Sequence, residues 1–183
     1  MPIIKKKISV TNTIFRGLYI LKLNKINDSR GYFLRYFSKD IFKKINFKKN
    51  IVQINVSHNL KKGTFRGFHY QIKPFSETKI LMVLSGSIYD LAIDLRRNSK
   101  TYLKIFSIKL SSDDNKILII PKGFAHGYLT LKKNTKIIYL VDNYYNSVYE
   151  RGIRINDNFF NIKLPYKINS ISKKDCNWNS FKK

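Results

Sequence analysis

The segment GTFRGFHYQ, residues 63–71, brings a guanidinium, an imidazole and a side-chain amide together with two glycines. It is typical of a strand, and side-chain alternation predicts two faces, with Phe65, Gly67, His69 and Gln71 on one and Arg66, Phe68 and Tyr70 on the other. Glycines within a strand indicate a bend or a close approach of the backbone to a ligand. Because an imidazole titrates near neutral pH, His69 is a candidate general base.

A second segment, PKGFAHG at residues 121–127, again places turn residues before a histidine, His126. The chain has three histidines, and two of them lie in these two segments. We expect the rest of the chain to be a scaffold that brings His69 and His126 to one site. The alternative for His126 is a histidine that is hydrogen-bonded within the core.

The composition predicts a single globular domain over residues 1–183, with a core at about 27–165 and a tail at 166–183. Hydrophobic residues make up 43% of the chain and aromatic residues 14%, which is enough apolar surface for a core without a disulfide or a structural metal. Cys176 is the single cysteine, so no disulfide forms within the chain. The first ten residues lack the apolar stretch of a signal peptide, and no apolar run is long enough to span a bilayer. We therefore expect a cytoplasmic protein that does not bind a membrane.

The net charge of +25 raises the question of nucleic-acid binding, since 36 basic residues stand against 11 acidic ones. Lysine supplies 28 of the basic residues and arginine eight, whereas bidentate phosphate recognition favours arginine. The lysines are also spread along the whole chain as pairs and triplets. We therefore do not expect a nucleic-acid partner, although a basic surface would attract a small anionic substrate.

Short apolar runs separated by turn residues predict strands at 14–21, 51–57, 64–71, 80–84, 87–95, 103–110, 117–120, 127–131 and 136–141. Ser38 is a candidate N-cap for one short helix, in which Ile41, Phe42 and Ile45 would face inward. The many short strands at regular spacing favour an all-β sandwich or barrel. The polar tail after Pro165 has no clear pattern, and its structure stays open.

Several motifs follow one another in a fixed order: RGYF at 30–33, RGFHYQ at 66–71, DLAIDLRR at 90–97, IPKGFAHG at 120–127, DNYY at 142–145, ERGIR at 150–154 and ISKKD at 171–175. Together, over about residues 27–175, they resemble the dTDP-4-dehydrorhamnose 3,5-epimerase family. The spacing of Gly63 and His69, and of Pro121, Gly123 and His126, also resembles the two halves of a cupin signature. The resemblance implies an all-β, cupin-type jelly-roll barrel with one or two short helices, a homodimer and a dTDP-sugar substrate.

The donor set argues against a metal site. A metal-binding cupin would be expected to carry His-x-His in its first half, but here Gln71 stands two places after His69. With three histidines in the chain and no carboxylate at the usual spacing, the three or four ligands of a transition-metal site are not available. We expect neither a metal nor another cofactor, which leaves His69 for acid–base chemistry.

The resemblance also implies catalytic roles. His69 would be the general base, oriented by Asp175, and would remove a proton beside a ketone. The resulting enolate oxyanion needs fixed positive charge or hydrogen-bond donors, which Lys79 and Arg66 would supply, with His126 as a further donor. Tyr139 would deliver a proton to the opposite face of the carbon. The alternatives are that Tyr139 is a core residue and that Lys79 is a solvated surface charge.

Binding residues follow from the resemblance in the same way. Gln53 and Asn55 match polar contacts to the nucleotide, Arg30 matches a phosphate or base contact, and Glu150 matches a further substrate contact. Asp90 resembles a carboxylate near the site, with a solvated surface charge as its alternative. The nearby charged residues Asp94, Arg96 and Arg97 are interpreted as structural.

The sequence predicts an epimerase that inverts carbons three and five of a dTDP-4-keto-6-deoxyhexose, in deoxysugar synthesis. The alternatives are a single-site epimerase or ketoisomerase on a related nucleotide sugar, a non-catalytic nucleotide-sugar-binding cupin and, less favoured, a nucleic-acid binder. One departure bears on specificity: Arg35 stands where the family usually has glutamate. That reversal of charge affects the contacts expected with the nucleotide base.

Overall fold

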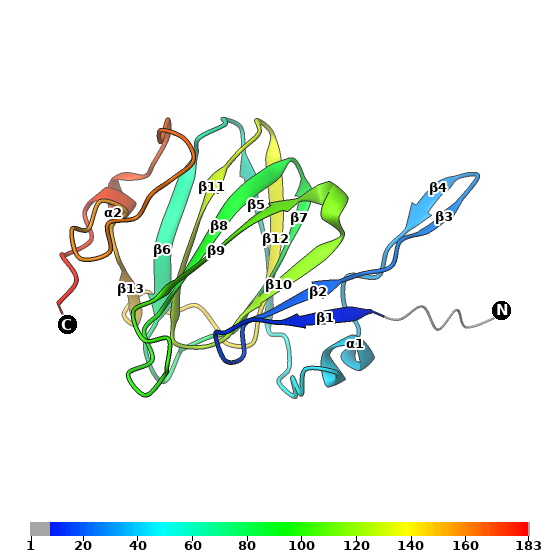
Figure 1. The fold of residues 1–183 in the computed structure, drawn as a ribbon, viewed down its shortest axis with the longest axis horizontal. Helices are drawn as coiled ribbons and strands as arrows, with labels where there is room; N and C mark the ends of the chain where they lie inside the picture. The colour runs from blue at the N-terminus through cyan, green and yellow to red at the C-terminus, as the bar shows by residue number, and fades with distance from the viewer. Residues whose placement is uncertain (1–7, 183) are drawn as a thin grey trace.

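The structure, a computed structural model, describes residues 8–182 and contains two antiparallel sheets that face each other (Figure 1). One sheet has the strand order β1 (Ser9–Asn12), β2 (Tyr19–Lys22), β10 (Lys116–Ile120), β7 (Lys79–Ser85), β12 (Thr135–Val141) and β5 (Gln53–Asn59). The other has the order β13 (Glu150–Gly152), β6 (Phe65–Gln71), β11 (Phe124–Thr130), β8 (Ser87–Asp94) and β9 (Ile105–Ser111). This arrangement confirms the predicted all-β class.

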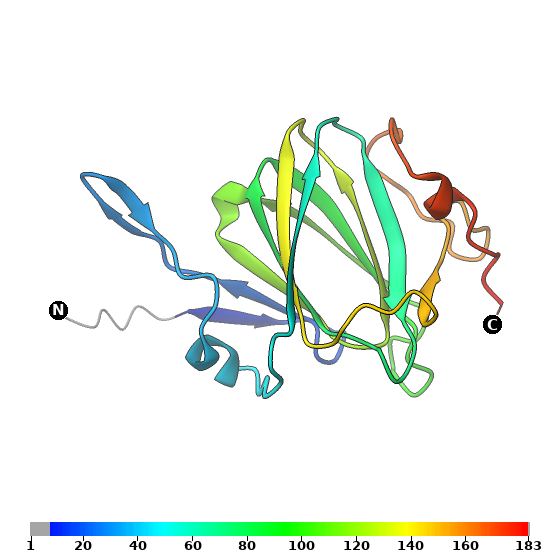
Figure 2. The same cartoon turned by 180° about the vertical axis from the view of Figure 1, so that it is seen from behind.

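A separate hairpin and three short helical segments complete the described part of the chain. The hairpin consists of β3 (Ile26–Asp28) and β4 (Gly31–Phe33) and projects beyond the barrel in both views (Figures 1 and 2). The helical segments are α1 (Lys39–Lys43), the 3₁₀ turn η1 (Ser112–Asp114) and α2 (Lys173–Cys176). Ser38 caps α1 by accepting a hydrogen bond from the Ile41 amide, as predicted.

Alternating apolar residues form the core between the two sheets, and the inner face becomes polar along the same strands. On β12, Ile137 packs in this core, whereas Tyr139 further along the strand lines a cavity. On β7, Val83 is buried in the core and Lys79 lines the same cavity. The strands therefore position a polar site at one end of an apolar interior.

The outer face of each sheet is covered by different segments. Ile41 and Phe42 of α1 pack on the six-stranded sheet, with Ile45 partly buried beside them. Chain that follows β13, including Ile153 and Phe160, packs on the five-stranded sheet. Residues after Pro165, whose structure was left open because they show no clear pattern, lie next to β6 (Figure 1).

Strand boundaries differ from the predicted runs by more than two residues at two places. The run at 14–21 forms a strand only from Tyr19, because Phe15 and Leu18 are buried in a turn that the Thr13 hydroxyl closes by donating to the Leu18 carbonyl at 2.9 Å. Strand β11 starts at Phe124 and not at Gly127. The short strands β1, β3, β4 and β13 were not predicted, since three or four residues carry no periodicity that can be recognised.

The predicted alternation along β6 is wrong. His69 pairs with His126, but Arg66 pairs with Tyr128, so β6 has one extra residue opposite β11. Arg66 and His69 consequently line the same cavity, while Phe65 and Phe68 both pack in the cluster on the outer face. The extra residue lies at Gly67, whose φ is +128° and where a Cβ would approach the Gly127 Cα to 2.5 Å. The bend expected from the glycines is present, and it changes which side chains share a face.

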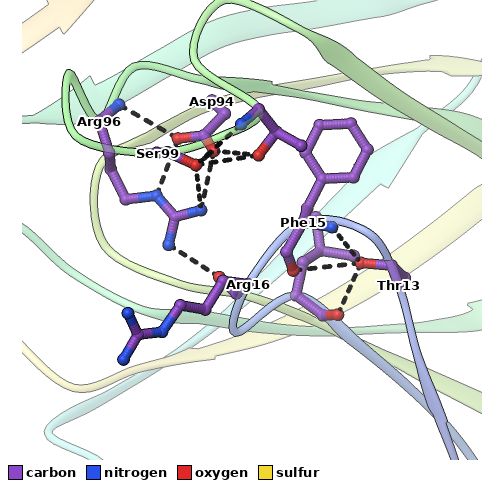
Figure 3. Close-up of polar contacts among 8 residues, drawn as sticks. Thr13, Phe15, Arg16, Asp94, Arg96 and Ser99 are labelled. Atoms are coloured by element: carbon purple, nitrogen blue, oxygen red, sulfur yellow. Dashed lines mark hydrogen bonds and ion pairs between the residues drawn. The ribbon is translucent and has the colours of Figure 1, made fainter.

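Asp94 and Arg96 form a structural network, as predicted (Figure 3). The Asp94 carboxylate, which is fully buried, accepts hydrogen bonds from the Arg96 guanidinium at 2.8 Å and from the hydroxyls of Ser99 and Thr101 at 2.6 and 2.7 Å. Arg96 also donates to the Arg16 carbonyl at 2.7 Å, which links the turn at residues 13–18 to the barrel. Burial opposes ionisation of Asp94, but these hydrogen bonds outweigh it and lower its pKa to about 2.

Candidate active site

A cavity of about 500 Å³ lies between the two sheets. Eight of the eleven residues predicted for the site line it: Gln53, Asn55, Arg66, His69, Lys79, His126, Tyr139 and Glu150. They come from β5, β7 and β12 of one sheet and from β6, β11 and β13 of the other. Two further predicted residues, Asp175 and Asp90, are hydrogen-bonded to the two histidines of this set.

His69 forms a close pair with Asp175, although the two are far apart in the sequence. The distance from His69 Nε2 to Asp175 Oδ1 is 2.6 Å, and the Gly67 amide donates to Oδ2 of the same carboxylate at 3.2 Å. Ser172 caps α2 and accepts from the Asp175 amide, which fixes the helix that carries the carboxylate. Burial disfavours the ionised form of Asp175, but the hydrogen bonds from His69 and Gly67 outweigh that effect and lower its pKa. Asp175 is therefore a carboxylate partner in position to orient the His69 ring.

His126 forms a second pair, with Asp90, directly across from the first. His126 Nε2 lies 2.8 Å from Asp90 Oδ2, and the Cα positions of His126 and His69 are paired between β11 and β6. Asp90 is completely buried, which excludes a solvated surface charge. Burial raises the pKa of Asp90, and the nearby His126 and Lys79 offset only part of that increase. The structure thus places His126 both in a hydrogen-bonded pair and on the cavity wall.

Two cations of the site are held by fixed acceptors. Lys79 Nζ donates to the His69 carbonyl at 3.3 Å, and its side chain is only 13% exposed, so it is not a solvated surface charge. Arg66 Nε donates to Asn59 Oδ1 at 2.8 Å. Both groups line the cavity and give it positive charge at defined positions.

Tyr139 approaches the cavity from the sheet opposite to His69. Its side chain is partly buried against the apolar core between the sheets and also lines the cavity, so Tyr139 is both a core residue and a cavity residue. Burial raises the pKa of the Tyr139 phenol, and the neighbouring Tyr128 and Glu77 raise it further. A phenol that stays protonated in this position can donate a proton.

Several residues that line the cavity or contact its lining were not predicted as site residues. The Tyr145 hydroxyl donates to Glu150 at 2.7 Å, and Lys174 forms an ion pair with the same carboxylate. Glu77 lines the cavity next to Lys79, and Tyr128 lies beside Ser57 with a distance of 2.9 Å between the hydroxyls. The proximity of Glu77 to Lys79 in the sequence was a usable signal. The contact between Lys174 and Glu150 depends on how the tail folds back and has no local signature.

Arg30 does not reach this cavity within the same chain. It lies in the turn of the β3–β4 hairpin, where its guanidinium pairs with Asp28 at 2.7 Å and its side chain is 88% exposed. The hairpin points away from the side of the barrel that carries α2 and Asp175 (Figures 1 and 2). A contact between Arg30 and the substrate stays a prediction.

No group of three or more His, Cys, Asp or Glu side chains within residues 8–182 is arranged to hold a metal ion. The two carboxylates nearest the histidines are each already paired with a ring nitrogen. In the same range, no helix is long and apolar enough to cross a membrane.

The comparisons with known proteins agree with this geometry. The family model described as dTDP-4-dehydrorhamnose 3,5-epimerase matches residues 12–183. A relative from Shigella flexneri with the same name is 33% identical over 174 residues, which cover 94% of this chain and 96% of the relative. This chain belongs to the dTDP-4-dehydrorhamnose 3,5-epimerase family.

Solved structures of family members have the same fold. The Bacillus anthracis dTDP-4-dehydrorhamnose 3,5-epimerase, crystallised with TDP and PPi bound, has a TM-score of 0.92 and 34% identity, covering 96% of this chain and all of that one. A Legionella pneumophila dTDP-6-deoxy-D-glucose-3,5-epimerase in complex with dTDP-4-keto-L-rhamnose has a TM-score of 0.89 and 30% identity, covering 95% and 93% of the two chains. These comparisons confirm the family resemblance and the cupin-type fold predicted from the motifs.

Proposed function

We propose that this protein is an epimerase that inverts carbons three and five of dTDP-4-keto-6-deoxy-D-glucose through enolate intermediates, in dTDP-L-rhamnose synthesis. One observation carries the proposal. A histidine that is paired with a carboxylate and a tyrosine phenol line one cavity from opposite sheets, His69 on β6 and Tyr139 on β12. Inversion at a carbon needs a proton removed from one face and another delivered to the opposite face, and this arrangement provides a group on each wall.

His69 acts as the general base. Its Nε2 atom is engaged by Asp175 at 2.6 Å, so Nδ1 is the ring atom left to accept a proton from the carbon beside the ketone. The Asp175 carboxylate stabilises the imidazolium that forms and holds the ring in one orientation. General base catalysis of this kind contributes roughly 10²–10⁴-fold to the rate.

The enolate oxyanion is stabilised by fixed positive charge. The Lys79 side chain is mostly buried at the cavity wall and donates to the His69 backbone carbonyl, which places its ammonium near the base that generates the enolate. Arg66 and His126 line the same cavity and add donors. Because these groups are held before the reaction, little reorganisation is needed when the charge develops.

Tyr139 returns a proton from the other wall. Burial, together with the charges of its neighbours, raises its pKa, so the phenol is protonated at neutral pH. Transfer to the face opposite His69 produces the inverted carbon. The first inversion leaves the abstracted proton on His69 and a phenolate at Tyr139. Exchange with solvent removes the proton from His69 and returns one to Tyr139, and the same pair then serves the second carbon after the substrate has turned or shifted in the cavity.

Polar residues at the mouth bind the nucleotide sugar. Gln53 and Asn55 of β5 line the cavity, and Glu150 is held by Tyr145 and Lys174. The net charge of +25 raises the local concentration of a dianionic diphosphate sugar. No metal or other cofactor takes part, because each proposed step uses a side chain of this chain.

We also propose a homodimer, in which the hairpin β3–β4 lies against a second copy and brings Arg30 to the site. The hairpin projects from the barrel (Figure 2) and exposes Ile26, Tyr32 and Phe33, each more than 40% accessible. Large apolar side chains on a two-stranded hairpin are stabilised when a partner covers them.

The proposal is tested by turnover. The purified protein is incubated with dTDP-4-keto-6-deoxy-D-glucose, a 4-keto reductase and NADPH, and the configuration of the reduced sugar is determined. We expect an L-rhamno product formed in proportion to the protein added. Inversion at carbon three alone would identify a single-site epimerase, a shifted keto group would identify a ketoisomerase, and binding without turnover would identify a non-catalytic module.

A further inference from the structure

Glu77 is a carboxylate in the cavity wall that has no role in the proposed mechanism. It stands two residues before Lys79, and its side chain is only 12% exposed. Glu77 Oε1 lies 3.3 Å from Lys79 Nζ, so the two mostly buried side chains form an ion pair at the cavity wall.

The Lys79 ammonium is held from two sides. One partner is Glu77, and the other is the backbone carbonyl of His69 at 3.3 Å. A lysine has four flexible side-chain bonds, and a single acceptor leaves its ammonium free to move over a wide arc. Two acceptors fixed on different segments restrict it to one position, close to the residue proposed as the base.

Glu77 is itself fixed by its surroundings. Its Oε2 accepts from Gln71 Nε2 at 3.1 Å, and Gln71 is 5% exposed. Gln71 Oε1 accepts from the Asn146 amide at 2.7 Å, so its side chain is tied to a second loop. The amide of Thr78, next to Glu77, donates to Asp142 at 2.6 Å. Contacts with two loops therefore hold the Glu77 carboxylate in place, and the carboxylate in turn holds the Lys79 ammonium.

We propose that Glu77 is a positioning residue that holds the Lys79 ammonium in place for the enolate oxyanion. The assignment rests on the proposed epimerase function and adds to it a residue that does not touch the reacting atoms.

The test is Glu77→Gln, which keeps the size of the side chain and an oxygen that can accept from Gln71. We expect kcat to fall about 10-fold to 100-fold, because a displaced catalytic group costs up to about 100-fold. KM and the affinity for dTDP should change less than about twofold. Affinity is measured from the fluorescence of Trp178, the single tryptophan, whose ring centroid lies 6.3 Å from that of His69.

A double-mutant cycle with Lys79→Met separates positioning from a structural role. If Glu77 acts through Lys79, adding Glu77→Gln to Lys79→Met causes no further loss of kcat. Losses that multiply would show that Glu77 acts independently and would overturn the proposal. Glu77→Asp retains the charge on a shorter side chain and should keep more activity than Glu77→Gln.

Asp40→Asn is the matched control, since Asp40 pairs with Lys43 on the surface at 3.2 Å. It should leave kcat unchanged. A folded Glu77→Gln protein with wild-type kcat, or a Glu77→Asp protein as impaired as Glu77→Gln, would overturn the proposal. A wild-type protein without turnover would instead reject the epimerase function on which the assignment rests.

Discussion

Replacing Asp175 by asparagine tests the His69–Asp175 pair with little change in shape. The wild-type carboxylate lies 2.6 Å from His69 Nε2 and is 3% exposed. An asparagine fills the same space and can still accept from the Gly67 amide. It removes the negative charge that faces the imidazolium, and an amide that donates to Nε2 would also leave the ring proton on Nδ1, where it blocks proton abstraction.

The structure gives a magnitude for this change. At the observed 2.6 Å and an effective dielectric constant of about 20, Coulomb's law gives roughly 6 kcal/mol between the carboxylate and a full imidazolium charge. The neutral hydrogen bond that replaces it recovers about 1 kcal/mol. We therefore expect the barrier to rise by about 3–5 kcal/mol, which corresponds to a loss of about 10²–10⁴-fold in kcat.

The assay is steady-state turnover with the coupled reductase, accompanied by thermal unfolding and by a dTDP titration that follows Trp178 fluorescence. Asp157→Asn is the control, because Asp157 is also 3% exposed but accepts from the backbone amides of Phe159 and Phe181. We expect it to lower stability without lowering kcat. A folded Asp175→Asn protein with kcat within about threefold of wild type would refute the role of the pair.

Three further outcomes follow from the structure. Tyr139→Phe retains the packed ring but removes the hydroxyl, so it should retain exchange of the acidic hydrogens while losing about 10²-fold or more of the inverted product; equal losses of both would contradict the separate roles. The folded-state pKa of Asp94, about 2, lies below its unfolded value of 3.8, so its charge stabilises the fold above about pH 4 by roughly 2 kcal/mol, and that contribution is lost as the pH falls through 2. Urea unfolding at several pH values should therefore show a weaker loss of stability in acid for Asp94→Asn than for wild type, and identical pH profiles would contradict the prediction. Exhaustive chelation should leave turnover unchanged, and a loss that one divalent ion restores would show that a metal takes part.

The sequence was sufficient to predict the fold class and most residues of the candidate site, because reactive side chains and turn residues occur together in short motifs. His126 directly precedes Gly127, His69 lies two residues after Gly67, and the sheet brings the two histidines opposite each other. Lys79 and Tyr139 were located by the resemblance, and the structure places both at the cavity.

The features that could not be predicted depend on contacts between residues that are distant in the sequence. The alternation on β6 fails at Gly67, since the extra residue is defined only by the register with β11. Lys174 reaches Glu150 only because the tail folds back over β13. Arg30 lies in the turn of the β3–β4 hairpin and does not line the cavity, and the residues of the hairpin do not show that it projects from the barrel.

Solvent labelling tests the central claim most directly. The protein and dTDP-4-keto-6-deoxy-D-glucose are incubated in heavy water with the reductase and NADPH, and the spontaneous exchange of the acidic hydrogens is subtracted. An epimerase that forms enolates on both sides of the ketone must incorporate deuterium at carbon three and at carbon five of an L-rhamno product. Inverted product without deuterium at these carbons, or no exchange above the spontaneous rate in the presence of bound substrate, would contradict the account.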